Sequence, residues 1–511
     1  MDEQHQPDTS GRRPNIVVIQ ADQLAAAALG AYGNPVVQSP HIDALAGAGV
    51  VFDRAYCNSP LCAPSRASMM TGRMPSSIGA FDNAADFSTS TPTFAHHLRA
   101  AGYHTALVGR MHFIGPDQLH GFEERHTTDV YPAGLDMVPD WELQGSERLQ
   151  WYHDTDSVFT AGASVATVQR DFDDEVIFRT LRHLTDRARA GDAPFLLVAS
   201  FIHPHDPYEP PVEHWRRYDG VEIDDPAVPP LLPEKMDPHS RRLLEMCGFD
   251  QKMPSPEEVR NARRAYYAAV SYVDDHVGRI VARLEELGLR ENTVVILTSD
   301  HGDMLGERGL WYKMSPFEQS ARVPLIISAP GRLEPRRVAE PVSLIDLLPT
   351  LVELSEAEPA ETEGRSVVGL SRGEAAPSTD VVIEYLAEGL AAPQITLVRG
   401  SLKLVVCPGD PDQLYDLATD PDELHNLAGE SVVAQEYAEL RGAIAERYDL
   451  DRLADDVRGS QRQRRFVQGA LARGATVDWD YEPSLPSPYV RGDFWTAIAR
   501  GRIPSGEGAS K

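Results

Sequence analysis

Apolar runs alternate with segments of helical spacing along the N-terminal part of this chain. Four short runs rich in β-branched residues are typical of strands buried on both faces: Asn15–Ile19, His104–Val108, Phe195–Ala199 and Thr293–Leu297. The segments with helical spacing are Ser39–Gly49, Thr93–Ala101, Asp171–Ala190 and Glu257–Leu287. Strands and helices in this order predict an α/β fold, with a mostly parallel central sheet and helices on both of its faces.

The pattern changes after residue 375. Val381–Glu384, Ile395–Val398 and Lys403–Val406 are predicted to be short strands, with a helix at Val433–Arg447. We therefore expect a large domain over residues 1–375 and a small C-terminal α+β domain over residues 376–448. Residues 449–511 form a tail with little apolar periodicity outside Phe466–Leu471, so this tail must dock on another surface or stay mobile.

The composition narrows the function classes. A net charge of −29 argues against nucleic acid and anionic membrane surfaces as partners. No apolar run approaches the length of a membrane helix, and residues 1–13 are polar throughout. The 4 cysteines do not make a disulfide framework. We expect a cytoplasmic protein with no nucleic acid and no membrane among its partners.

Two predicted strands each end in an aspartate, Asp22 and Asp300. Parallel strands bring their carboxyl ends to one edge of a sheet, where open α/β folds bind their ligands. Carboxylates gathered at such an edge repel each other unless a cation joins them. A metal site is therefore one interpretation of the pair, and helix capping is the alternative.

The stretch from Cys57 to Arg73 contains a cysteine in an unusual setting. It includes Cys62-Ala63-Pro64-Ser65-Arg66, followed by Thr71-Gly72-Arg73. Pro64 is suited to the first turn of a helix, which would place Cys62 at a helix N-terminus that favours an anion. The alternative is a loop with a small buried thiol. The whole pattern resembles the signature of type I sulfatases, C-x-P-S-R followed by T-G-R.

This resemblance implies a covalent modification and a metal. In that family the cysteine is oxidised to formylglycine by a formylglycine-generating enzyme, and the hydrated aldehyde attacks the sulfur of a sulfate ester. The implied fold is an alkaline-phosphatase-like α/β sandwich. The implied ligands of one divalent cation are Asp22, Gln23, Asp300, His301 and the modified Cys62.

Two of these ligands depart from the common sulfatase pattern. Gln23 stands where sulfatases usually carry a second aspartate, and His301 stands where they carry asparagine. Compared with the common sulfatase pattern, the site gains an imidazole and loses one negative charge. Imidazole with carboxylate suits Mn²⁺ better than Ca²⁺, which prefers oxygen ligands. We predict manganese, with calcium as the alternative.

The resemblance also implies roles for other polar residues. Arg66 would position the aldehyde, and His112 would remove the proton of its second hydroxyl group, with Arg110 replacing a lysine usual two residues earlier. Lys313 matches a sulfate-binding lysine. His203 and His205 are both candidates for the histidine that protonates the departing alcohol, and their spacing does not decide between them.

Longer segments narrow the resemblance to the choline-sulfatase group. They include Asn83 and its neighbours, residues 115–125, His203–Tyr208 and Asp300–Trp311. Choline sulfate is thus the leading candidate substrate. That group carries a tryptophan near Met137, and its C-terminal tail reaches a neighbouring subunit, which implies a homo-oligomer. The substrate-binding candidates are Asn83, Arg110, Met137, Trp151, His153, Glu384 and Glu388.

Two other functions remain open at this point. Related enzymes with the same modified cysteine hydrolyse phosphonate monoesters or phosphodiesters. Alternatively, the chain is a non-catalytic binding protein whose Cys62 stays unmodified.

Overall fold

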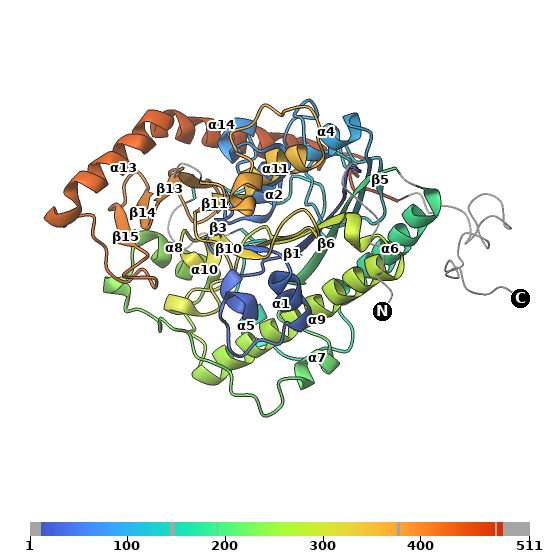
Figure 1. Cartoon of the computed structure of the whole chain (residues 1–511). Coiled ribbons are helices and arrows are strands. Elements are labelled where there is room, and N and C mark those ends of the chain that lie inside the picture. The colour runs from blue at the N-terminus through green and yellow to red at the C-terminus, as the bar shows by residue number, and fades with distance from the viewer. Residues whose placement is uncertain (1–11, 144–148, 192, 376–378, 476–477, 484–511) are drawn as a thin grey trace, which may run out of the picture.

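The computed structural model describes residues 12–143, 149–191, 193–375, 379–475 and 478–483. Its centre is an eight-stranded sheet in the order β10-β2-β9-β7-β1-β6-β4-β5 (Figure 1). These strands are β1 (Asn15–Asp22), β2 (Val50–Phe52), β4 (His104–Gly109), β5 (Glu124–Arg125), β6 (Phe195–Pro204), β7 (Thr293–Ser299), β9 (Leu325–Ser328) and β10 (Arg336–Val338). Among these eight strands only β9 runs antiparallel to its neighbours. The predicted mostly parallel α/β sheet is confirmed.

Alternate side chains of β1 enter two separate cores. Ile16 and Val18 pack with α2 (Cys62–Thr71), α4 (Phe94–Ala100) and α11 (Leu347–Leu354) on one face of the sheet (Figure 1). Val17 and Ile19 pack on the other face, with helices α1 (Pro40–Gly47), α6 (Val168–Ala190) and α9 (Pro256–Glu286). Each of these apolar side chains contributes about 1.5–3 kcal/mol through burial, which anchors β1 at the centre of the fold.

Side-chain caps set the beginnings of the two long helices. Ser255 accepts a hydrogen bond from the Glu258 N–H at the start of α9, and Thr167 accepts one from the Arg170 N–H at the start of α6. Both helices begin within a few residues of the predicted positions. The shorter helices are α3 (Pro75–Ile78), α5 (Asp156–Phe159), α7 (Val212–Arg216), α8 (Pro238–Cys247), α10 (Glu318–Ala321) and α12 (Val368–Arg372).

A smaller antiparallel sheet follows the central one along the chain. It contains β12 (Val381–Tyr385), β13 (Gln394–Arg399), β14 (Leu402–Val406) and β15 (Gln413–Asp416), of which β15 was not predicted. The predicted helix is present as α13 (Ala434–Arg447). A further three-stranded sheet is formed by β3 (Ala55–Tyr56), β8 (Arg322–Val323) and β11 (Val342–Ser343).

The tail begins with a helix that apolar periodicity did not reveal. α14 spans Leu450–Leu471 and packs against other parts of the same chain (Figure 1). It buries Leu453 and Val457, and it also makes polar contacts with distant parts of the chain. Gln461 accepts a hydrogen bond from the Trp141 backbone N–H at 3.0 Å. α14 therefore docks on its own chain, one of the two outcomes expected for the tail; the contact with a neighbouring subunit stays a prediction, and residues 484–511 lie outside the described residues.

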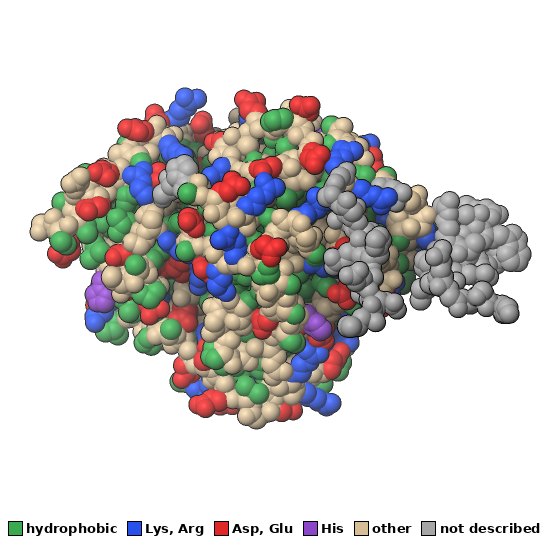
Figure 2. Space-filling model, viewed as in Figure 1, with side chains coloured by type: hydrophobic (Ala, Val, Ile, Leu, Met, Phe, Trp, Pro, Cys, Tyr) green, Lys and Arg blue, Asp and Glu red, His purple; other side chains and the backbone are tan. Residues whose placement is uncertain are grey.

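Neither acidic nor basic side chains form a patch of their own on the face of the molecule that Figure 2 shows. Figure 2 shows acidic and basic side chains interspersed over this side of the molecule. Across the described residues, no helix combines the length and the apolar character needed to cross a membrane.

The ion pair between Arg464 of α14 and Asp82 gives a test of this docking. Its two N···O distances are 2.6 and 2.7 Å, and the Asp82 side chain is fully buried. Arg464→Ala would leave a buried carboxylate unpaired, so we expect the free energy of unfolding to fall by about 3–5 kcal/mol in urea titrations. Arg462→Ala is the matched control, because Arg462 pairs with Glu142 at the surface, where such a pair contributes about 0–1 kcal/mol. Equal losses in the two variants would contradict this account.

Candidate active site

Four polar segments meet at one edge of the central sheet. Asp22 ends β1, Asp300 follows β7, His205 follows β6 and Arg110 follows β4. These four strands are parallel, so their carboxyl ends lie together. The N-terminus of α2 brings Cys62 to the same place. α2 begins at Cys62 and is followed by Gly72 with φ of 64°, as the helix interpretation of the motif predicts.

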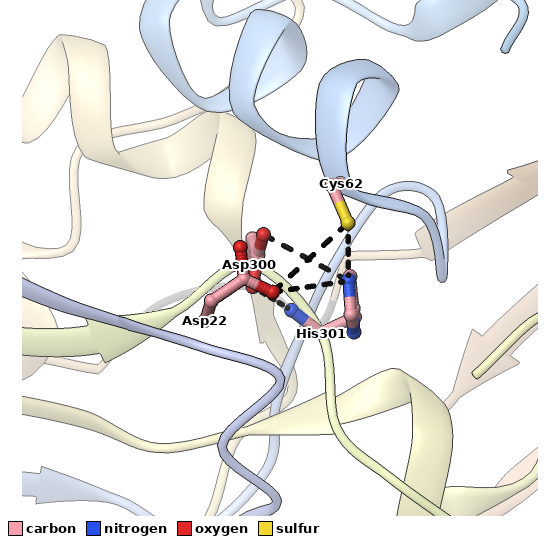
Figure 3. Close-up of side chains that lie close together, drawn as sticks. All are labelled: Asp22, Cys62, Asp300 and His301. Atoms are coloured by element: carbon pink, nitrogen blue, oxygen red, sulfur yellow. Dashed lines mark hydrogen bonds and ion pairs between the residues drawn. The ribbon is translucent and has the colours of Figure 1, made fainter. Parts of the chain in front are cut away.

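Cys62, Asp22, Asp300 and His301 form a buried cluster (Figure 3). One ligand atom from each residue lies within 4.8 Å of the others. The Cys62 Sγ atom is 3.2 Å from His301 Nε2 and 4.0 Å from Asp22 Oδ1. His301 Nδ1 lies 3.0 Å from the Gly302 carbonyl oxygen, so Nδ1 can carry the proton while Nε2 keeps its lone pair toward the cluster.

Arg66 compensates the charge of the two carboxylates. Its Nε donates to Asp300 Oδ2 and its Nη2 to Asp22 Oδ2, both at 2.8 Å. Arg110 Nη1 lies 2.9 Å from the same Asp22 oxygen. Burial by itself would raise the pKa of Asp22, but Arg110 and Arg66 outweigh it and lower that pKa; Arg66 does the same for Asp300. Both aspartates are therefore ionised.

The donor set fits one divalent cation. Two ionised carboxylates and an imidazole converge with residue 62, and burial lowers the pKa of His301, which keeps the imidazole neutral. Gln23 lies beside this set, but both ends of its amide are engaged. Its Oε1 accepts from Lys313 Nζ at 2.7 Å, and its Nε2 donates to Asp303 Oδ2 at 2.6 Å. The role of Gln23 as a ligand stays a prediction.

A cavity of about 290 Å³ opens next to Cys62. The predicted residues that line it are Cys62, Asn83, Arg110, His112, Met137, Trp151, His153, His205, Lys313 and Glu388. Tyr131, Tyr152 and Asp206 also line it. Tyr131 and Asp206 were missed as site residues, although Asp206 lies in the segment His203–Tyr208 that sequence analysis singled out and Tyr131 lies six residues before Met137.

The structure separates the two histidines that sequence spacing left equivalent. His205 lines the cavity, and its Nε2 is 2.6 Å from Lys313 Nζ. Burial and the Lys313 charge lower the pKa of His205 well below its usual value. His203 turns toward α6, where its Nδ1 contacts Asp173 Oδ2 at 2.7 Å. His203 is not among the described residues that line the cavity, so the geometry favours His205 as the proton donor, which stays a prediction.

His112 and Asn83 are held by neighbouring polar groups. Asp129 Oδ2 accepts from the backbone N–H of His112 at 2.9 Å, and His112 Nδ1 is 3.0 Å from Arg110 Nη2. The other nitrogen, Nε2, has no hydrogen-bond partner among the described residues. Asn83 Oδ1 accepts from the Ala63 N–H at 3.0 Å in the first turn of α2.

Of the two predicted glutamates, the structure places only Glu388 at the cavity. Glu388 is buried, and its Oε2 has no hydrogen-bond partner among the described residues. Glu384 is not among the described residues lining the cavity. Its carboxylate accepts from the Ser76 hydroxyl at 2.6 Å and from the Tyr448 hydroxyl at 2.7 Å, so the geometry favours Glu388 over Glu384 as a substrate-binding residue.

Comparison with solved structures supports the fold. The chain resembles the phosphonate monoester hydrolase of Agrobacterium radiobacter with a TM-score of 0.68 and 22% identity, over 88% of this chain and 96% of that one. It resembles the phosphonate monoester hydrolase from Silicibacter pomeroyi with a TM-score of 0.68 and 25% identity, over 85% and 95% of the two chains.

Sequence comparison identifies the family. Residues 306–449 match the C-terminal family of N-sulphoglucosamine sulphohydrolase, and residues 455–492 match the choline sulfatase C-terminal family. The chain is 32% identical to the uncharacterized sulfatase YidJ of Escherichia coli (strain K12), over 88% of this chain and 90% of that protein. It is 42% identical to the choline-sulfatase of Rhizobium meliloti (strain 1021), over 93% and 94%. With residues 14–357 matching the family described as Sulfatase, the chain belongs to the sulfatase family, as the motif at Cys62 predicted.

Proposed function

We propose that this sulfatase hydrolyses a small alkyl sulfate ester, with choline sulfate as the leading candidate, to an alcohol and inorganic sulfate. The observation that carries the choice of substrate is the buried carboxylate of Glu388, whose Oε2 has no partner among the described residues that surround it. Burial raises the pKa of Glu388 to about 7. A cationic alcohol would offset the cost of ionising this carboxylate.

Aromatic rings supply the rest of the recognition we propose. A trimethylammonium group has no N–H to donate, so it is bound by ring faces and carboxylates. Tyr131, Trp151 and Tyr152 line the same cavity as Glu388. The similarity to a choline-sulfatase supports the same assignment. The small volume of the cavity favours an alcohol of the size of choline.

The sulfate group of the substrate would lie next to a cluster of nitrogen-bearing side chains. At residue 62, formylglycine hydrate with a bound divalent cation supplies an activated hydroxyl nucleophile. Arg110 and Lys313 line the cavity beside it and hold positive charge toward the sulfate oxygens. The resemblance to sulfatases assigns to His112, which lines the cavity, the proton that must leave before sulfate is released; its Nε2 has no hydrogen-bond partner among the described residues. Lys313 Nζ lies 2.6 Å from His205 Nε2, and this pair is placed to supply a proton to the departing alkoxide.

We propose Mn²⁺ as the bound ion. Asp22, Asp300, His301 and residue 62 are the ligands that the geometry favours, and the imidazole suits a transition ion better than Ca²⁺. Maturation would require a formylglycine-generating enzyme. The match of residues 455–492 to a choline sulfatase C-terminal family supports our proposal of a homo-oligomer.

Mass spectrometry tests the modification directly. The tryptic peptide of residues 55–66 contains both Cys57 and Cys62. We expect Cys57 to be an alkylatable thiol and Cys62 to be an aldehyde or its hydrate, so Cys57 is an internal control. Cys62→Ala should abolish turnover without unfolding the protein, because it removes little packing. An active enzyme with two thiols in this peptide would contradict the mechanism, whereas an inactive protein with two thiols would favour the binding-protein alternative.

Metal replacement tests the ion. Removal of the metal with a chelator should stop turnover, and Mn²⁺ should restore it better than Ca²⁺. His301→Asn restores an oxygen ligand, so it should narrow the difference between the two ions. Equal rescue of the wild-type enzyme by Mn²⁺ and Ca²⁺ would overturn the assignment of manganese.

Substrate discrimination tests Glu388. We expect Glu388→Gln to lower kcat/KM for choline sulfate at least tenfold relative to an uncharged alkyl sulfate of similar size, because a desolvated contact with a cation contributes ~2 kcal/mol or more. The wild-type preference should also fall as the pH drops through about 7, since Glu388 then becomes protonated and loses its charge.

Glu384→Gln is the matched control for this experiment, because Glu384 is equally buried but lies away from the cavity. Met137→Trp adds an aromatic face and should raise the preference for choline sulfate. If Glu388→Gln and Glu384→Gln leave the ratio equally unchanged, Glu388 does not contact the alcohol. Faster turnover of a phosphonate monoester than of every sulfate ester tested would instead favour the alternative hydrolase function.

A further inference from the structure

A second cluster of possible metal ligands lies at the β5 edge of the sheet. Glu124 is in β5, and His126 is the first residue after β5. His183 belongs to α6, which lies beside this edge of the sheet (Figure 1). Within the part of the chain that the structure describes, these three residues place one ligand atom each within 4.8 Å of one another.

The cluster is separate from the active site. His104, which contacts Glu124, begins β4, whereas Gly109 ends β4 and precedes Arg110 of the cavity. Five residue steps along a strand span about 17 Å. β5 pairs with the middle of β4, where Glu124 lies opposite Ala106 and the His126 N–H donates to the Leu107 carbonyl. The cluster therefore lies between His104 and the active-site end of the strand, and it shares no side chain with the active site.

The ligand atoms already have the spacing of a coordination shell. His126 Nε2 lies 3.2 Å from His183 Nδ1 and 3.0 Å from Glu124 Oε2, and His183 Nδ1 lies 3.8 Å from the same oxygen. Ligands at about 2.0–2.1 Å from a tetrahedral Zn²⁺ ion are about 3.3 Å apart. Small rotations of these side chains would therefore suffice to bind an ion.

The two imidazole nitrogens of the cluster face each other, with His126 Nε2 3.2 Å from His183 Nδ1. His183 is buried in α6, so this contact lies at the inner side of the cluster. An ion at this point would satisfy both nitrogen lone pairs and the carboxylate together.

We propose that Glu124, His126 and His183 form a second metal site that binds Zn²⁺ or a similar divalent transition ion. Two imidazoles and one carboxylate are the ligands such ions prefer, and the 40% exposure of the Glu124 side chain leaves a path to solvent. His104 Nε2 lies 3.4 Å from Glu124 Oε1 and orients the carboxylate.

The ion would have a structural role. β5 is a two-residue strand at the edge of the sheet, and it pairs only with β4 among the described strands. A bound ion would join β5 to the middle of α6. It would also anchor the segment that leads to Asp129, which holds the backbone of His112 in the active site.

Metal content after zinc loading tests this proposal. Mature holoenzyme is incubated with excess Zn²⁺, passed through gel filtration, and assayed for metals by mass spectrometry. We expect the wild-type chain to retain one more equivalent of zinc than His126→Ala. His425→Ala is the matched control, because the His425 side chain is 80% exposed elsewhere on the surface and should leave the zinc content unchanged. Turnover of a sulfate ester reports that each variant is folded.

Two further measurements separate a metal site from a hydrogen-bonded cluster. Zinc should raise the melting temperature of the wild-type enzyme more than that of His126→Ala. Crystals soaked in Zn²⁺ should give an anomalous peak between Glu124, His126 and His183. Equal zinc content in wild type and His126→Ala, or soaked crystals without this peak, would overturn the proposal.

Discussion

The pairing of one buried arginine with two buried carboxylates is the interaction on which the active site depends. Asp22 and Asp300 end neighbouring parallel strands, in which Ala21 pairs with Ser299, so the fold forces their charges together. Burying either charge unpaired would cost several kcal/mol. Arg66 contacts both carboxylates at 2.8 Å and is itself completely buried. The ion pairs therefore require the sheet and α2 to be assembled at the same time.

This pairing also determines the position of Cys62. Cys62 and Arg66 are four residues apart on α2, so they lie on the same face of the helix. When Arg66 contacts the carboxylates, Cys62 is brought above them. Ser65 adds a hydrogen bond from its hydroxyl to the Asp300 backbone carbonyl at 2.5 Å. The C-x-P-S-R motif thus encodes both the nucleophile position and the contacts that fix it.

The C-terminal part of the chain completes the other end of the cavity. Glu388 follows β12, and the Tyr385 hydroxyl donates to the Glu388 backbone carbonyl at 2.8 Å. α14 pairs with Asp82 next to Asn83, which in turn accepts from the first turn of α2. The central sheet therefore supplies the groups around Cys62, whereas the smaller sheet supplies the carboxylate that we assign to the alcohol.

The sequence by itself determined the four adjacent parallel strands β7, β1, β6 and β4, the cysteine motif and the two aspartates at strand ends, because each depends on local pattern. Burial on both faces makes a strand uniformly apolar, and a helix start needs only neighbouring residues. Tertiary structure decided which of His203 and His205 faces the cavity, since a bend after β6 turns one toward Asp173 and the other toward Lys313. It also separated Glu384 from Glu388 and revealed α14, whose docking depends on the distant Asp82. These partners lie from 30 residues apart (His203 and Asp173) to 382 residues apart (Asp82 and Arg464), and only packing brings them together.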